Sequence, residues 1–229
     1  MTDGIEWIHE ALHGQGVAFQ LVALKDAEVG DLAMMPGAEP GTVMDPPTCN
    51  AIVAASGGTV RLPDLARLGT CGGWAFAFET GEGIFRYNRS HLRHLWEGRT
   101  YVHISDTAMD PPMVVAVVDG KWDWQYFDGE VHEQVRADHP LTARMTVEIG
   151  LGSSKPDPGY PDDPDEWGLY VPAMADVYRL FGEHYRLALP RRTIGDPYYK
   201  NNELYGAFTA PRTLPDGQPN PKYDDIRRP

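Results

Sequence analysis

Cysteine and histidine are the residues in this chain whose types and spacing best suit catalysis or metal binding. Cys71 lies in the glycine-flanked stretch RLGTCGGWAFAFE, and a cysteine paired with a histidine would make the chain a hydrolase. A reactive thiolate needs a helix N-terminus, a cation or a histidine beside it. The residues after Cys71 alternate as a strand does, so we favour a structural role. A cysteine-dependent hydrolase that uses Cys71 with a histidine is the alternative.

Two histidines are spaced as metal ligands or as catalytic partners often are. His91 and His94 are three residues apart on a predicted helix, where both imidazoles would share one side. They flank the apolar positions Leu92 and Leu95, and the sequence has no HExxH motif. We therefore interpret them as helix-surface residues and keep them as the alternative partners of Cys71.

Other signatures of a reaction or a cofactor are absent from the sequence. It has no phosphate-binding GxxxxGK[ST] loop, no GxGxxG turn and no GxSxG elbow. The acidic segment 157–166 is interrupted by prolines and does not follow the spacing of a calcium-binding loop. Two cysteines, Cys49 and Cys71, do not make a disulfide framework. We expect no cofactor, no metal and no catalytic residue.

The C-terminal segment holds a cluster of aromatic residues suited to binding a protein. Tyr198, Tyr199, Tyr205 and Phe208 lie in the stretch PYYKNNELYGAF. Exposed aromatic side chains concentrate binding energy at protein interfaces. We expect a non-catalytic binding or assembly protein whose C-terminal arm contacts a protein partner or a second copy of the chain.

The net charge excludes some kinds of partner. The 229 residues carry a formal charge of −13 at pH 7. A nucleic acid or an anionic membrane surface would repel such a chain. No apolar run approaches the roughly 20 residues that a membrane helix requires. The sequence begins without the basic and apolar regions of a signal peptide, so we expect a cytoplasmic protein.

Hydrophobic periodicity predicts alternating helices and strands along most of the chain. Predicted helices cover residues 5–12, 25–37, 88–98 and 172–189, and predicted strands cover residues 17–24, 74–79, 84–87, 100–105, 113–118, 121–127 and 143–152. Residues 38–50 hold three prolines and predict a loop, residues 51–56 fit either a short strand or a helix, and residues 63–68 suit one helical turn. Seven prolines from residue 190 onward argue against regular structure there.

The clearest local signal is a hairpin around Asp119-Gly120. These two residues suit a type I′ turn, in which both central residues have positive φ. Trp122, Trp124 and Tyr126 alternate with polar residues and are expected on one face of the second strand. By the same reasoning, the strand 74–79 presents Trp74, Phe76 and Phe78 on one face and two alanines on the other.

Residues 5–130 resemble an uncharacterised bacterial family known only as a domain of unknown function. The resemblance rests on IEWIHEAL, VAFQLVAL, KDAEVGDL, GGWAFAFE and DGKWDWQYFDG, in that order. It implies a mixed fold and supplies no activity. We expect the α+β class, with a mostly antiparallel, meandering sheet that carries helices on one face. A C-terminal helix and an extended proline-rich arm follow, so that residues 1–189 form one domain and residues 190–229 the arm.

Overall fold

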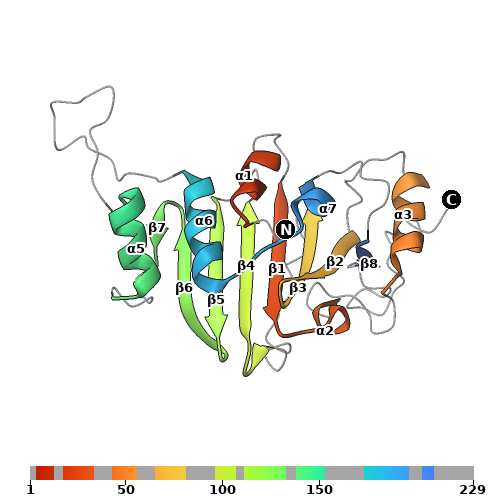
Figure 1. Cartoon of the computed structure of the whole chain (residues 1–229), viewed down its shortest axis with the longest axis horizontal. Coiled ribbons are helices and arrows are strands. Elements are labelled where there is room, and N and C mark those ends of the chain that lie inside the picture. Colours follow the sequence, from red (N-terminus) through yellow and green to blue (C-terminus); the bar gives the residue numbers. More distant parts are fainter. Residues whose placement is uncertain are drawn as a thin grey trace, which may run out of the picture.

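The computed structural model confirms the α+β class. It describes residues 4–12, 18–33, 43–55, 65–80, 96–106, 111–132, 138–152, 173–195 and 203–208. These residues build one antiparallel sheet of eight strands in the order β7-β6-β5-β4-β1-β3-β2-β8 (Figure 1). Strands β4 to β7 form a meander, and β1 lies between β4 and β3 at the centre of the sheet.

The strands and helices have the following bounds. The strands are β1 (Phe19–Lys25), β2 (Leu65–Cys71), β3 (Trp74–Thr80), β4 (Thr100–Asp106), β5 (Met113–Val118), β6 (Lys121–Phe127), β7 (Glu130–Val131) and β8 (Tyr205–Phe208). The helices are α1 (Trp7–Ala11), α2 (Val29–Ala33), α3 (Pro46–Ala55), α5 (Pro140–Ile149), α6 (Met174–Tyr185) and α7 (Arg191–Gly195).

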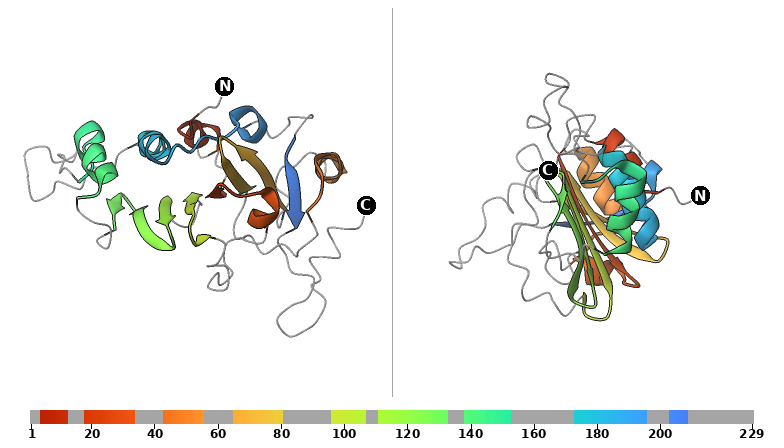
Figure 2. Two further views of the ribbon diagram at one scale, coloured as in Figure 1. Left: turned by 60° about the horizontal axis from the view of Figure 1, so that its bottom comes forward. Right: turned by 90° about the vertical axis from the view of Figure 1, so that its left-hand side faces the viewer.

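Helices α1, α5, α6 and α7 cover one face of the sheet, which we call the helix face (Figure 2). Alternation along each strand turns one set of side chains to this face and the other set to the second face. On β3 the helix-face side chains are Trp74, Phe76 and Phe78, as the sequence predicts, and the two alanines between them face the other way. The short helix α2 packs on the second face, near β2 and β3.

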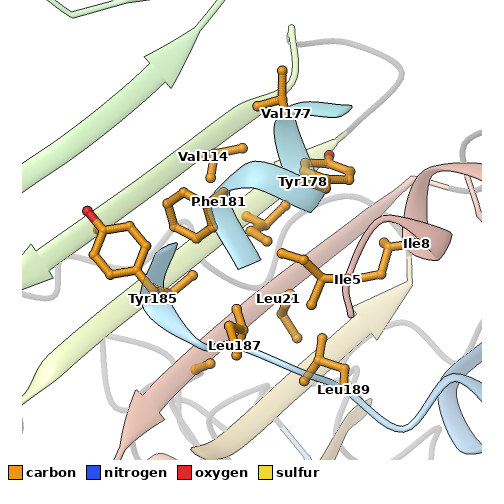
Figure 3. Close-up of a cluster of buried hydrophobic side chains, with 14 of the residues drawn as sticks. Ile5, Ile8, Leu21, Val114, Val177, Tyr178, Phe181, Tyr185, Leu187 and Leu189 are labelled. Atoms are coloured by element: carbon orange, nitrogen blue, oxygen red, sulfur yellow. The ribbon is translucent and has the colours of Figure 1, made fainter. Parts of the chain in front are cut away.

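Helix α6 fills the centre of the helix face. Its apolar stripe of Met174, Val177, Tyr178, Phe181 and Tyr185 is buried throughout. Figure 3 shows Phe181 and Tyr178 between the helix and the strands, with Ile5 of the N-terminal segment beside them. Burial of aromatic and aliphatic side chains is the main source of stability in such a layer.

Gly182 allows α6 to approach the N-terminal segment closely. A Cβ atom at this position would lie 2.8 Å from Ile5 Cγ1 and 3.2 Å from the carbonyl oxygen of Leu187. We expect Gly182→Ala to lower the free energy of unfolding by about 1–2 kcal/mol, because overpacking outweighs the helix propensity gained. Gly30→Ala in α2 is the matched control, since nothing lies within 4 Å of that position. Urea unfolding should show destabilisation at residue 182 alone, and equal effects would contradict this packing.

The predicted hairpin is confirmed, and a second one follows it. Asp119 and Gly120 have φ values of 51° and 73°, as a type I′ turn requires. Asp128 and Gly129 have φ values of 51° and 86° and connect β6 to β7 in the same way. The second Asp-Gly pair carried the same sequence signal, although the sequence analysis did not use it.

Three elements differ from the sequence predictions. Residues 46–50 begin α3 instead of forming a loop, because Asp45 Oδ1 accepts a hydrogen bond from the N–H of Thr48 and prolines occupy the first turn. Residues 65–68 extend as β2 and not as a helical turn. The predicted strand 143–152 is helix α5, which His139 caps at its start and Gly150, with φ of 69°, ends.

The C-terminal segment also holds regular structure that the sequence analysis did not predict. Residues 191–195 form α7, and residues 205–208 form β8, which pairs with β2 at the sheet edge. Pairing with β2 provides hydrogen-bond partners for the backbone of β8, so a strand forms there although the local sequence does not favour one. The predicted strand 84–87 and most of the predicted helix 88–98 lie outside the described residues. The division into a domain and an arm stays a prediction.

Candidate functional site

The residues that the sequence nominated do not form one described site. Cys71 ends β2 opposite Trp74, and its side chain is partly buried against the helix-face core. The candidate histidines His91 and His94 lie outside the described residues, and so do Tyr198 and Tyr199. Of the other two arm residues, Phe208 belongs to β8, and Tyr205 of the same strand is 41% exposed.

A β-bulge in β6 changes which tryptophan is exposed. Ala116 of β5 pairs with Trp124, but the next residue of β5, Val117, pairs with Trp122, so Asp123 is an extra residue in β6. Trp124 is completely buried, whereas Trp122 is 63% exposed. The prediction that Trp122 shares a face with Trp124 and Tyr126 was therefore wrong. A single inserted residue reverses the alternation of every side chain before it.

Asp123 anchors this bulge to two helices. Its Oδ2 atom accepts a hydrogen bond of 2.7 Å from the hydroxyl of Tyr185, at the end of α6. The same oxygen lies 3.4 Å from Nε2 of His139, whose Nδ1 accepts a hydrogen bond from the N–H of Leu141 and so caps α5. Because Nδ1 accepts, the proton of a neutral His139 resides on Nε2 and faces the carboxylate. The cluster of Asp123, His139 and Tyr185 holds the bulge in place.

His184 completes this cluster on its solvent side. Its ring lies 5.3 Å from that of His139 and 4.7 Å from that of Tyr185, measured between ring centroids. Burial lowers the pKa of His184, and His139 and Arg144 act in the same direction, against the opposing effect of Asp123. Burial and the hydrogen bond to Asp123 raise the pKa of Tyr185, so its hydroxyl stays protonated and donating.

The lowered pKa of His184 predicts a pH dependence of stability. Between the native pKa and the ordinary value of 6.5, the unfolded chain binds more protons than the native one. Stability should therefore fall as the pH drops through this interval. We expect His184→Gln to reduce this fall, measured by urea unfolding at a series of pH values from about 5 to about 8. An unchanged profile in the variant would contradict the assignment.

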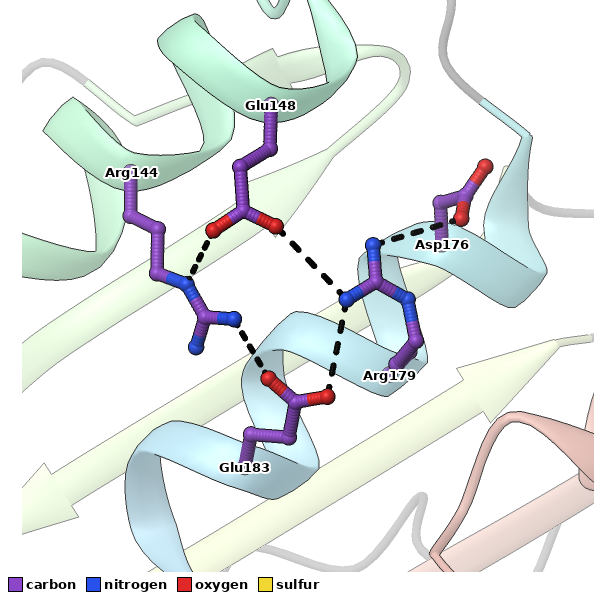
Figure 4. A network of polar contacts seen from close by, with 5 residues as sticks. All are labelled: Arg144, Glu148, Asp176, Arg179 and Glu183. Atoms are coloured by element: carbon purple, nitrogen blue, oxygen red, sulfur yellow. Dashed lines mark hydrogen bonds and ion pairs between the residues drawn. The ribbon is translucent and has the colours of Figure 1, made fainter.

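A network of charged residues joins α5 to α6 next to this cluster. Arg144 and Glu148 of α5 contact Arg179 and Glu183 of α6, and Arg179 also lies 3.5 Å from Asp176 (Figure 4). Glu183 forms ion pairs with both arginines, and its Oε1 atom lies 3.5 Å from Nη1 of Arg179. These side chains are partly exposed, and such pairs contribute little energy each. The network links α5, which begins next to His139, to α6, while the buried core residues of both helices hold them on the sheet.

The bulge places two large aromatic residues on the same face of β6. Trp122 and Phe127 are five positions apart and would face opposite ways on a regular strand. With the bulge, Trp122 pairs with Val117 and Phe127 with Met113, and both of these partners pack on the second face. Phe127 is 43% exposed. We call Trp122 and Phe127 the β6 aromatic pair.

A row of polar side chains crosses the centre of the second face. Gln20 of β1 pairs directly with Glu79 of β3 and with Ser105 of β4. His103 lies on β4, two residues before Ser105. Glu79, Gln20 and His103 are 3%, 8% and 9% exposed. Buried side chains that can hydrogen-bond mark the part of this face where polar chemistry is possible. Alternation along each strand places these residues on one face, but only the pairing of β1 with β3 and β4 brings them into one row.

Comparison with known proteins gives no relative of this chain: no protein-family model matches it, and neither does any curated protein or solved structure. Among the described residues, no helix is long and apolar enough to span a membrane. The same residues hold no group of three or more His, Cys, Asp or Glu side chains placed to bind a metal ion.

Proposed function

We propose that this chain is a non-catalytic protein-binding protein that contacts its partner through the β6 aromatic pair. The observation that carries the proposal is the exposure of Trp122 beside β5, whose residues Val115 and Val117 are apolar and buried on the same face of the sheet. A tryptophan exposed to water loses favourable burial energy unless a partner covers it, and tryptophan is enriched among the residues that dominate protein interfaces.

The anchoring of Asp123 supports the proposal. The bulge that exposes Trp122 is held by Tyr185 from one helix and His139 from another. Both ring nitrogens of His139 contact groups of this chain, Nδ1 the N–H of Leu141 and Nε2 the carboxylate of Asp123, which supports a positioning role for this histidine. The cluster of Asp123, His139 and Tyr185 thus holds the bulge that turns Trp122 outward for contact with a partner.

Tyr205 of the C-terminal arm lies on the same face of the sheet as this pair, on the strand at the other end of the sheet order. Tyr205 pairs with Leu68, whose side chain packs on the second face, so Tyr205 faces the same way as Trp122 and Phe127. The arm residues Tyr198, Tyr199 and Phe208, with Tyr205, are part of the proposed contact with a partner or a second copy. The net charge of −13 favours a basic protein surface as the partner and disfavours nucleic acid.

Photo-crosslinking in extracts of the native host tests this function. Benzoylphenylalanine replaces Trp122 in one variant and Val147 in the control, because Val147 of α5 is 86% exposed and lies away from the second face. We expect one discrete adduct from position 122 that position 147 does not give. An adduct with a second copy of the chain would identify self-association. The same adducts from both positions, or none from position 122, would contradict the proposal.

The alternative function is a hydrolase that uses Cys71 with a histidine, and alkylation separates it from binding. We expect iodoacetamide to label native Cys71 slowly, because its side chain packs against the core, and Cys49 not at all, because it is fully buried and its burial raises the pKa of its thiol. Mass spectrometry of Cys71→Ser and Cys49→Ser variants resolves the two thiols. Labelling of Cys71 faster than a free thiol would favour the hydrolase.

A further inference from the structure

We infer that the groove between β7 and α5 binds an extended, basic peptide segment of the partner, which adds to the sheet as a strand beside β7. This inference rests on the proposed protein-binding function and specifies how part of the partner is recognised. It depends on a groove, on an open strand edge and on the negative charge beside the groove.

The groove is a pocket of about 320 Å³ between the last strand of the sheet and the helix beside it. It is lined by Gly129, Glu130, Val131, Thr142, Thr146, Leu151 and Gly152. The first three belong to the turn before β7 and to β7 itself, and the two threonines belong to α5 (Figure 1). A groove between an edge strand and a helix is a recurring site for peptides bound as an added strand.

The backbone of β7 offers an edge for pairing. β7 is the terminal strand in the sheet order, and no strand of the described residues pairs with its outer side. Glu130 pairs with Phe127, and the N–H of His132 donates to the carbonyl oxygen of Gln125, so both neighbours of Val131 face β6. The alternation of an antiparallel ladder then turns the N–H and C=O of Val131 outward. These two groups are positioned to bond an added strand.

The residues that line the groove determine which side chains a bound peptide segment can place in it. Val131 and Leu151 pack against the helix-face core and give the groove an apolar floor. The hydroxyl of Thr142 accepts from Trp124 Nε1, and that of Thr146 donates to the carbonyl oxygen of Thr142, so the threonines are fixed by the helix and the core. The volume suits one aliphatic side chain together with the backbone that carries it.

The charge of the rim selects a basic segment. Glu130 is exposed and its backbone lines the groove, but it pairs with Phe127, so its side chain lies on the second face, where the neighbours of a groove-bound side chain would also point. Asp128 is exposed in the turn that leads to Glu130. The chain as a whole carries −13. A lysine or arginine next to the aliphatic residue would therefore meet a negative surface, and its attraction would weaken with added salt.

Selection from a phage library of random linear 12-residue peptides against the full-length protein tests the inference. We expect a consensus with an aliphatic residue and a neighbouring lysine or arginine. In the synthetic consensus peptide, successive amides are N-methylated one at a time, and binding should fall at the single position whose N–H donates to the carbonyl oxygen of Val131, because Val131 alone of the two β7 residues turns its backbone groups outward. Loss of one backbone hydrogen bond should weaken binding about tenfold.

Two variants of the protein locate the site. Val131→Pro removes the outward N–H, which an edge strand tolerates, and should weaken the peptide about tenfold, whereas Val131→Thr keeps the N–H and should not. Glu130→Gln should weaken it about threefold. No enriched peptide, equal binding to the two Val131 variants, or an N-methylation profile in which no single amide is more sensitive than the others would each overturn the inference. Crosslinking at position 122 is independent of these results, so either can fail while the other holds.

Discussion

Trp124→Ala is expected to lower the free energy of unfolding by about 3–5 kcal/mol, while Trp122→Ala, two residues away, changes it by less than about 0.5 kcal/mol. Trp124 is completely buried, its ring lies 5.6 Å from that of Phe181, and its Nε1 donates to Thr142. Alanine at position 124 would leave a cavity, and the hydroxyl of Thr142 would lose the hydrogen bond that Nε1 donates. Trp122 is 63% exposed, so its removal leaves the core unchanged.

Urea unfolding of the two variants measures this difference. A domain of this kind has a stability of about 5–15 kcal/mol, so the Trp124 variant loses a large share of it. The pair is matched because the two substitutions remove the same atoms from the same strand. Equal losses would mean that the bulge at Asp123 does not separate the two faces.

The second large effect is expected on binding. Trp122→Ala should weaken the interaction with the crosslinked partner by about 30-fold or more, which corresponds to about 2 kcal/mol for a central interface residue. We attribute this weaker binding to the aromatic surface that the partner covers, because Trp122→Ala hardly changes the free energy of unfolding. Calorimetric titration of the purified partner measures the affinity.

Lys121→Ala is the control for this titration. Lys121 neighbours Trp122 and is exposed, but it pairs with Val118, which packs on the helix face. An affinity that Trp122→Ala leaves unchanged, or that Lys121→Ala lowers equally, would contradict the role of the β6 aromatic pair.

Much of the sheet was predictable because its signals are local. The alternation in strands β1, β3 and β4 and the Asp119-Gly120 turn each depend on a few consecutive residues. Helix α5 was misread because its Thr and Val residues suit strands. Its own signals were the proline at its first position and Gly150 at its end. The start of helix α3 was missed in the same way, since the prolines after Asp45 were interpreted as a loop, whereas a helix was one of the two alternatives for residues 51–56.

The candidate site was not predictable because it depends on contacts between distant residues. Asp123 meets Tyr185 across 62 residues of sequence, and the bulge that this contact holds determines which tryptophan is exposed. A regular alternation of Trp122, Trp124 and Tyr126 gives no sign of an inserted residue. The buried row of Gln20, Glu79 and His103 likewise requires β1 to pair with both β3 and β4, neither of which follows β1 directly in the sequence.

Hydrogen exchange of the chain, alone and bound to the crosslinked partner, tests the proposed binding surface most directly. We expect the partner to slow exchange in residues 113–132, which span β5, the aromatic pair on β6, and β7. Protection confined to residues 65–80, around Cys71, with β6 and β7 unchanged, would show that the aromatic pair is not where the partner binds.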